Sequence, residues 1–197
     1  KALKYLDKYE LKEYNWRKKN KMPLVPYNDD IRYLSISTNP DKEMTDTYLR
    51  ELNKDFKNLT IFGRSEGVLI MKKFGREKEA KRFLESVKEY TMFKEGFGRY
   101  FATDLAYYSW MDYRIPTQLA AMRAVQSYST KEHDPFLLDM QLWLLRQKQT
   151  QVWQNPINAL DVADFLLTTN RSESLHEVTT PTLTLDGKSV VQDSIYT

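Results

Sequence analysis

The 197-residue chain has no cysteine, only two histidines, six glycines and seven prolines. The absence of cysteine excludes disulfides, thiolate metal sites, a nucleophilic cysteine and an internal thioester within these residues. The low glycine and proline content argues against a loop-rich or disordered chain. No run of about 18 apolar residues is present, so the sequence predicts no membrane-spanning helix.

The composition is that of a folded domain with no charged partner indicated. Hydrophobic residues make up 41% of the chain, enough for one core. The net charge of +3 is too small to indicate nucleic-acid binding. The basic stretch at residues 1–21 is spread around a predicted helix, and we interpret it as a solvated face. Lys1 lies inside a helical pattern without an initiator Met or signal-type segment, so we expect the sequence to be part of a longer protein.

Helical periodicity dominates as far as Asn170. Apolar residues recur at helical spacing in residues 2–16, 27–37, 44–56, 77–90 and 136–145. Residues 77–90 have one apolar stripe and a charged back. Residues 68–71 and 136–145 are apolar on most sides, so we predict that the 136–145 helix is among the most enclosed. These two classes of helix indicate two concentric layers.

Asn or Asp followed by Pro marks three predicted helix starts. The Asn or Asp side chain caps the helix, and Pro fits the first helical position because the backbone N–H that it lacks would have no hydrogen-bond partner there. These starts are Asn39-Pro40, Asp134-Pro135 and Asn155-Pro156. Pro116 is expected in the first turn of another helix. The unit that begins Tyr113-x-x-Pro116 aligns, 40 residues later, with Trp153-x-x-Pro156. Repeated helical hairpins stack into solenoids or close into rings.

After Asn170, Ser, Thr and Pro become frequent, and residues 182–191 alternate around Asp186-Gly187. This pattern predicts a β-hairpin. We therefore predict a helical domain over residues 1–170, followed over residues 171–197 by a linker and a hairpin that begins a further β domain.

The sequence offers little catalytic chemistry. His133 and His176 have no metal-ligand spacing, and no Gly-x-Ser-x-Gly elbow or phosphate-binding glycine loop is present. Asp29 and Asp30 could be the paired carboxylates of an inverting glycosidase on a helical toroid, or acids that complement a helix N-terminus. We predict that the chain is not an enzyme and has no catalytic, cofactor-binding or metal-binding residues.

An aromatic-rich segment could serve as a sugar or peptide platform or could pack between helices, and packing is the interpretation we favour. Its members are Tyr100, Phe101, Tyr107, Tyr108, Trp110 and Tyr113. The segment lacks helical periodicity and follows Gly98, which indicates a partly extended conformation.

Two segments resemble a known family. Residues 142–161 contain the end of a helix at Arg146-Gln147, a short turn, Trp153 and a capped helix rich in Ala and Leu, and residues 107–125 form a similar preceding unit. They resemble the helical thioester domain of bacterial alpha-2-macroglobulin-like proteins. Residues 147–153 also resemble the Gln-Trp repeat of terpene cyclases, which share the α/α-toroid fold, although Gln151 stands where those have Gly. The aspartate cluster of the cyclases has no counterpart here.

The resemblance implies an all-α fold, an α/α toroid present as a partial ring of helical hairpins, followed by the β-hairpin. It implies a non-catalytic domain of an endopeptidase inhibitor, a protease trap for host defence in the bacterial periplasm or at the cell surface, membrane-anchored through the parent chain. Its partners would be proteases and other domains of the same chain, without a cofactor. Because no cysteine is present, the family's Cys-x-Glu-Gln thioester either lies upstream of Lys1 or does not exist in this protein. The alternatives are a toroid enzyme such as a glycosidase and a helical-repeat peptide-binding module.

A partial ring would leave apolar stripes uncovered at its two ends. We expect those stripes at Ala2, Leu3, Leu6 and Tyr9 near the start, and at Val162, Phe165 and Leu166 near the other end. Such exposed stripes would favour pairing of two copies of the chain.

Overall fold

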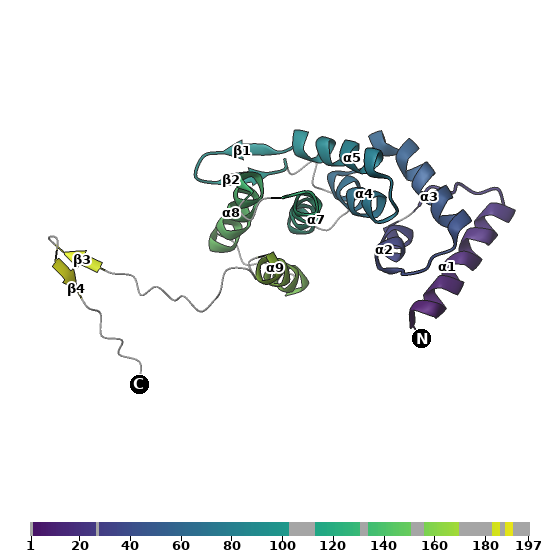
Figure 1. Ribbon diagram of the computed structural model, residues 1–197, viewed down its shortest axis with the longest axis horizontal. Coiled ribbons are helices and arrows are strands. Elements are labelled where there is room, and N and C mark those ends of the chain that lie inside the picture. Colours follow the sequence, from purple (N-terminus) through teal and green to yellow (C-terminus); the bar gives the residue numbers. More distant parts are fainter. Residues whose placement is uncertain are drawn as a thin grey trace. The chain divides into compact units, whose positions relative to one another are not determined.

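The computed structural model describes residues 2–26, 28–102, 113–130, 134–150, 156–169, 183–185 and 188–190 (Figure 1). These residues contain eight α-helices, one 3-10 turn and four short strands, which confirms the mainly helical prediction. The chain divides into two compact units, Lys1–Ala159 and Leu160–Thr197, with the border inside helix α9. The boundary at residues 170 and 171 stays a prediction.

The element bounds follow the predicted segments closely. The first unit contains α1 (Ala2–Lys19), α2 (Asn28–Ile36), α3 (Lys42–Lys54), η1 (Phe56–Asn58), α4 (Ile61–Lys73), α5 (Glu77–Glu89), β1 (Met92–Lys94), β2 (Gly98–Tyr100), α7 (Arg114–Gln126) and α8 (Pro135–Thr150). Helix α9 (Pro156–Thr169) crosses the border, and β3 (Leu183–Leu185) and β4 (Lys188–Val190) belong to the second unit. Strands β3 and β4 pair antiparallel, with Leu183 opposite Val190, which confirms the predicted hairpin.

The helix starts depend on which side chain reaches a free backbone N–H. Asp134 caps α8, since its Oδ1 accepts from the N–H of Phe136 at 3.0 Å, as predicted. Helix α3 begins at Lys42, so the predicted start at Asn39-Pro40 is wrong. Its cap is Asp41, whose carboxylate accepts from the N–H of Met44 at 2.9 Å and complements the positive end of the helix. Pro116 lies in the first turn of α7, as expected, and Asn155 lies outside the described residues.

Helix α4 is the centre of packing in the first unit. It packs extensively against α5 and α7 and also contacts α2, so that α2, α4 and α7 form a row of neighbouring helices (Figure 1). At the end of α4, Lys73 Nζ donates to the carbonyl oxygens of Leu34, Ser35 and Ser37 at 2.9, 2.8 and 2.6 Å, and so holds the C-terminal end of α2. Helices α3 and α5 lie on one side of this row (Figure 1).

The most enclosed helix is α7 rather than α8. Helix α7 buries eight of its thirteen residues, among them Ala120, Ala121 and Ala124, whose small side chains let neighbouring elements approach closely. The prediction that the 136–145 helix is among the most enclosed is wrong, because Leu138 is 46% and Leu145 51% exposed. The helix buries only the face that packs on β2 and α7.

A second pair of strands, β1 and β2, follows α5 and precedes α7 in the sequence. Strands β1 and β2 pair antiparallel, with Met92 opposite Tyr100, and the sequence patterns did not predict this hairpin. Gly96 and Gly98 have φ values of 69° and 95°, in the left-handed region that favours glycine. The two glycines are the sequence signal for this hairpin.

The predicted exposure of the terminal apolar residues is confirmed at one end only. Ala2, Leu3 and Tyr9 of α1 are exposed and Leu6 is half-buried. The expected exposure of Val162 and Phe165 is wrong, because both are buried, and Leu166 is half-buried. Helix α9 has apolar residues on two faces, and its exposed ones are Ile157, Leu160 and Leu167.

Gly67 marks the closest approach of α4 to α5, and Gly67→Ala is expected to destabilise the protein. An added Cβ would lie 2.5 Å from the Cδ1 and Cε1 atoms of Phe83, a fully buried ring. We expect a loss of about 1 to 3 kcal/mol in urea unfolding, the usual effect of overpacking a core. The control is Gly63→Ala on the same helix, where the nearest atoms are 3.5 Å away or more. That change should be neutral or stabilise by up to about 1 kcal/mol through helix propensity, and equal losses at the two sites would contradict the packing.

Candidate functional site

The two candidate carboxylates, Asp29 and Asp30, have different environments. Both lie in the first turn of α2, where Asp29 is exposed and Asp30 is 6% exposed. Asp30 Oδ2 forms an ion pair with Arg17 Nη2 of α1 at 3.1 Å, and its Oδ1 accepts from the Tyr48 hydroxyl of α3 at 3.1 Å. Arg17 Nη2 also donates to the Tyr48 hydroxyl. The structure therefore does not bring Asp29 and Asp30 together as a pair.

Glu10 of α1 is the carboxyl group that meets Asp30. Glu10 is 6% exposed, and the Asp30 carboxyl group is near enough to act on it through its charge and as a hydrogen-bond partner. Burial, together with the nearby Asp30 charge and this hydrogen bond, raises the pKa of Glu10 from 4.5 to about 7. Two carboxyl groups in contact favour holding one proton between them. We call Glu10, Arg17, Asp30 and Tyr48 the buried charge cluster.

Sequence reasoning missed Glu10 and Arg17 because both lie in a lysine-rich helix that we interpreted as a solvated face. That interpretation is wrong for one side of α1, where Glu10, Tyr14 and Arg17 are buried. Their spacing of i, i+4 and i+7 places them on the same helix face. This periodicity of polar residues was the signal available in the sequence.

Further polar contacts surround the buried charge cluster. Asp7 Oδ1 accepts from the Tyr33 hydroxyl at 3.0 Å and from Ser37 Oγ at 2.9 Å. The Tyr14 hydroxyl donates to Thr47 Oγ1 at 3.3 Å, and the Tyr14 ring packs edge-on against Tyr48 at 5.7 Å. Burial raises the pKa of Tyr33 to about 12, so this hydroxyl stays protonated and can donate. These contacts join α1 to α2 and α3.

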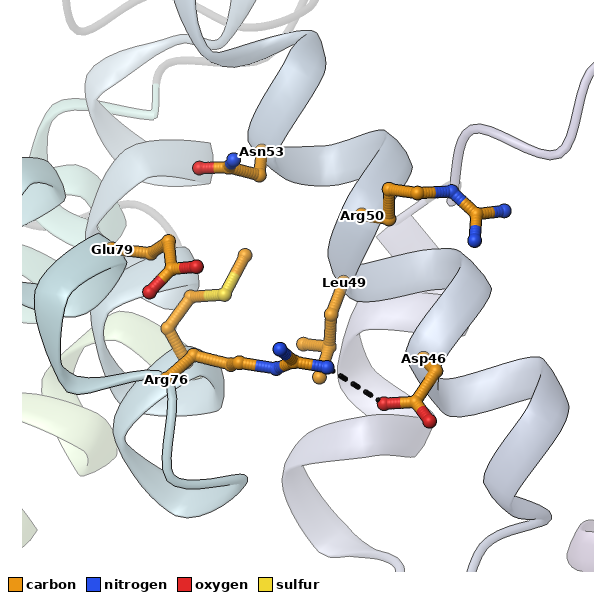
Figure 2. Close-up of a pocket in the computed structure, with 7 residues that line it drawn as sticks. Asp46, Leu49, Arg50, Asn53, Arg76 and Glu79 are labelled. Atoms are coloured by element: carbon orange, nitrogen blue, oxygen red, sulfur yellow. Dashed lines mark hydrogen bonds and ion pairs between the residues drawn. The ribbon is translucent and has the colours of Figure 1, made fainter.

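A cavity of about 330 Å³ lies elsewhere, between α3 and the α4–α5 connection (Figure 2). Its lining includes the buried Leu49 and Met71, and polar residues at its rim. Figure 2 shows Arg76 reaching across to Asp46, and the two side chains form an ion pair at 2.9 Å. Arg50 pairs with Glu51 at 3.2 Å. Because both rim arginines have acidic partners, the cavity has no concentration of charge of one sign.

The described members of the aromatic segment pack against neighbouring parts of the fold and are buried or half-buried. Tyr100 stacks on Trp143 of α8 with ring centroids 6.3 Å apart, and Phe101 is buried. Tyr113 packs edge-on against Phe62 of α4 at 5.8 Å. The packing interpretation is confirmed for these three residues. Tyr107, Tyr108 and Trp110 lie outside the described residues.

In the part of the chain that the structure describes, no three His, Cys, Asp or Glu side chains are placed to hold a metal ion. His133 and His176 lie outside that part. None of the described helices is both long enough and apolar enough to cross a membrane. The chain matches no family model, no curated protein and no solved structure.

Proposed function

We propose that the chain is a non-catalytic helical domain of an alpha-2-macroglobulin-like endopeptidase inhibitor, a protease trap of the bacterial cell envelope. The row formed by α2, α4 and α7, with α3 and α5 on one side of it, is the observation that carries this proposal. In an α/α toroid, successive helices alternate between an inner and an outer layer, and this arrangement supports that fold. The resemblance at residues 107–125 and 142–161 supports the family, and the described parts of these segments include nearly all of α7, the second half of α8 and the start of α9.

The buried charge cluster supports a structural role for the acids of α1 and α2. The carboxyl groups of a glycosidase pair are separated by about 5 Å or more so that a sugar or a water fits between them. Glu10 and Asp30 are both buried, and both oxygens of Asp30 already have partners in Arg17 and Tyr48. Asp29 is exposed, and in the first turn of α2 it complements the helix dipole.

A size-selective inhibition assay tests the proposal. The longer protein that contains this chain would be incubated with chymotrypsin, and the remaining activity measured on casein and on a small chromogenic peptide. A trap encloses the protease, so activity on casein should be largely lost while activity on the small peptide is retained. The same protein without residues 1–197 is the control and should not protect casein. Equal loss on both substrates, or no loss on either, would contradict the proposal.

The 197-residue chain alone is expected to hydrolyse no glycan, ester or peptide, with or without added zinc. Reducing-sugar release from a panel of polysaccharides measures the first of these. Turnover that disappears in the Asp29→Asn or Asp30→Asn variant would instead support the glycosidase alternative.

A further inference from the structure

Helix α1 buries three side chains fully against the rest of the first unit, and its aliphatic Leu6 and Leu11 are half-buried. Its buried side chains are Glu10, Tyr14 and Arg17, and two of these three are charged groups. Its exposed large apolar side chains are Leu3, Tyr5, Tyr9 and Trp16. Because no aliphatic side chain of α1 is fully buried, its charged and hydrogen-bonded groups contribute much of the free energy that keeps the helix docked.

The ionisable groups at this interface come from all three helices. From α1 come Asp7, Glu10 and Arg17, with the Tyr14 hydroxyl; from α2 come Asp29, Asp30 and the Tyr33 hydroxyl; from α3 comes the Tyr48 hydroxyl. At the centre of the buried charge cluster, the neighbouring carboxyl groups of Glu10 and Asp30 lie beside the guanidinium group of Arg17. If both carboxyl groups were ionised, the buried site would carry excess negative charge, which is strongly unfavourable in a low dielectric. One proton on the pair removes this excess.

We propose that α1 is a pH-dependent latch, which stays docked on α2 and α3 while the Glu10–Asp30 pair holds a proton and is released as the pair loses it. Release would uncover Tyr48 and Tyr33, which contact α1 through Tyr14 and Asp7. The exposed Lys18–Glu43 pair is solvent-screened and adds little to docking.

The direction of the pH dependence follows from which state, docked or released, binds the Glu10 proton more tightly. Burial and Asp30 raise the pKa of Glu10 to about 7 in the docked helix, whereas a released helix would give Glu10 its ordinary pKa of 4.5. The docked state therefore binds the proton more tightly, and docking weakens as the pH rises between these values. The docking equilibrium should change on the order of a hundredfold over this range.

A distance measurement on the full chain tests the latch. Because the chain has no cysteine, the pair Lys12→Cys on α1 and Lys42→Cys on α3, both at exposed positions, gives two unique sites for spin labels. Double electron–electron resonance should show a single short distance at about pH 5 and a growing, longer and broader population at about pH 8. The same labels in a Glu10→Gln background, which imitates the protonated acid, should give the short distance at both pH values. Glu13→Gln, which changes an acid of the same helix outside these contacts, should keep the pH response.

A distance distribution that does not change with pH in the labelled chain would overturn the proposal, as would an equal pH response in the Glu10→Gln chain. Amide hydrogen exchange in the unlabelled chain, corrected for the chemical exchange rate, gives an independent readout that does not depend on how the labelled variants fold. Amides of α1 should lose protection between about pH 5 and about pH 8 while those of α5 keep theirs. Parallel behaviour of the two helices would again overturn the proposal.

Discussion

Gly98→Ala is expected to separate the β1–β2 hairpin from α8 and to destabilise the protein by roughly 3 to 5 kcal/mol, the sum of backbone strain and overpacking. Gly98 has φ of 95°, and an added Cβ would lie 2.1 Å from the carbonyl oxygen of Asp139 and 2.9 Å from the amide nitrogen of Trp143. Both neighbours are backbone atoms of a regular helix, which cannot rotate away as a side chain could.

Several contacts depend on this approach. Arg99 pairs with Asp139 at 3.1 Å, and Tyr100 stacks on Trp143. Gln118 Nε2 of the enclosed helix α7 donates to the carbonyl oxygen of Arg99 at 2.8 Å and to that of Met140 at 3.2 Å, so it joins β2 and α8. Displacement of β2 would therefore disturb three elements at once.

Gly96→Ala is the matched control, because Gly96 has φ of 69° in the same hairpin but no atom within 4 Å of its added Cβ. It should cost only the strain of a left-handed residue, about 1 to 2 kcal/mol. Urea unfolding followed by circular dichroism measures both. Equal losses at positions 96 and 98 would show that the contact with α8 contributes nothing.

The double substitution Glu10→Gln/Asp30→Asn is expected to cost about 3 to 5 kcal/mol, the usual penalty for a buried charge left without its partner. Arg17 is 5% exposed. Each single substitution leaves one carboxyl group beside Arg17. In Asp30→Asn, Glu10 can ionise and become the counter-ion, and in Glu10→Gln the ion pair with Asp30 remains. The singles should therefore cost about 2 kcal/mol or less each.

A double-mutant cycle at neutral pH measures this coupling, which should exceed about 1 kcal/mol. Asp29→Asn, one residue away and exposed, is the control and should change stability by no more than about 1 kcal/mol, the loss of a helix-dipole interaction. Strictly additive losses for Glu10 and Asp30 would mean that the two acids do not share Arg17.

The sequence predicts best where one element determines its own pattern. Helix α5 combines an apolar stripe with a charged opposite face, and the sequence between β3 and β4 is Asp-Gly, so both elements follow from local rules. The enclosure of α8 does not, because an apolar sequence shows which faces could be buried but not which have neighbours. Leu138 and Leu145 are exposed for this reason.

The buried charge cluster could not be assembled from the sequence in the same way. The burial of Glu10 and Arg17 depends on Asp30 and Tyr48, which come from other helices. The local sequence pattern predicts that a lysine-rich helix is exposed to solvent. Contacts with other helices bury one face of α1, and these contacts cannot be read from the local pattern. The loop between β1 and β2, Glu95-Gly96-Phe97, has no Asn-Gly or Asp-Gly pair to mark a tight turn, so their pairing was not recognised. The toroid and the protease-trap function stay predictions.

The central position of α4 determines how far local damage spreads. Each helix of the row contacts mainly its immediate neighbours, so stability is expected to approximate a sum of nearest-neighbour interfaces. Undocking of α1 removes contacts with α2 and α3 only. A destabilising substitution in the middle of α4 affects the contacts with α2, α5 and α7 together. Regional unfolding should therefore begin at α1 and reach α4 last, so that mild denaturant removes the helices in an order set by their number of neighbours.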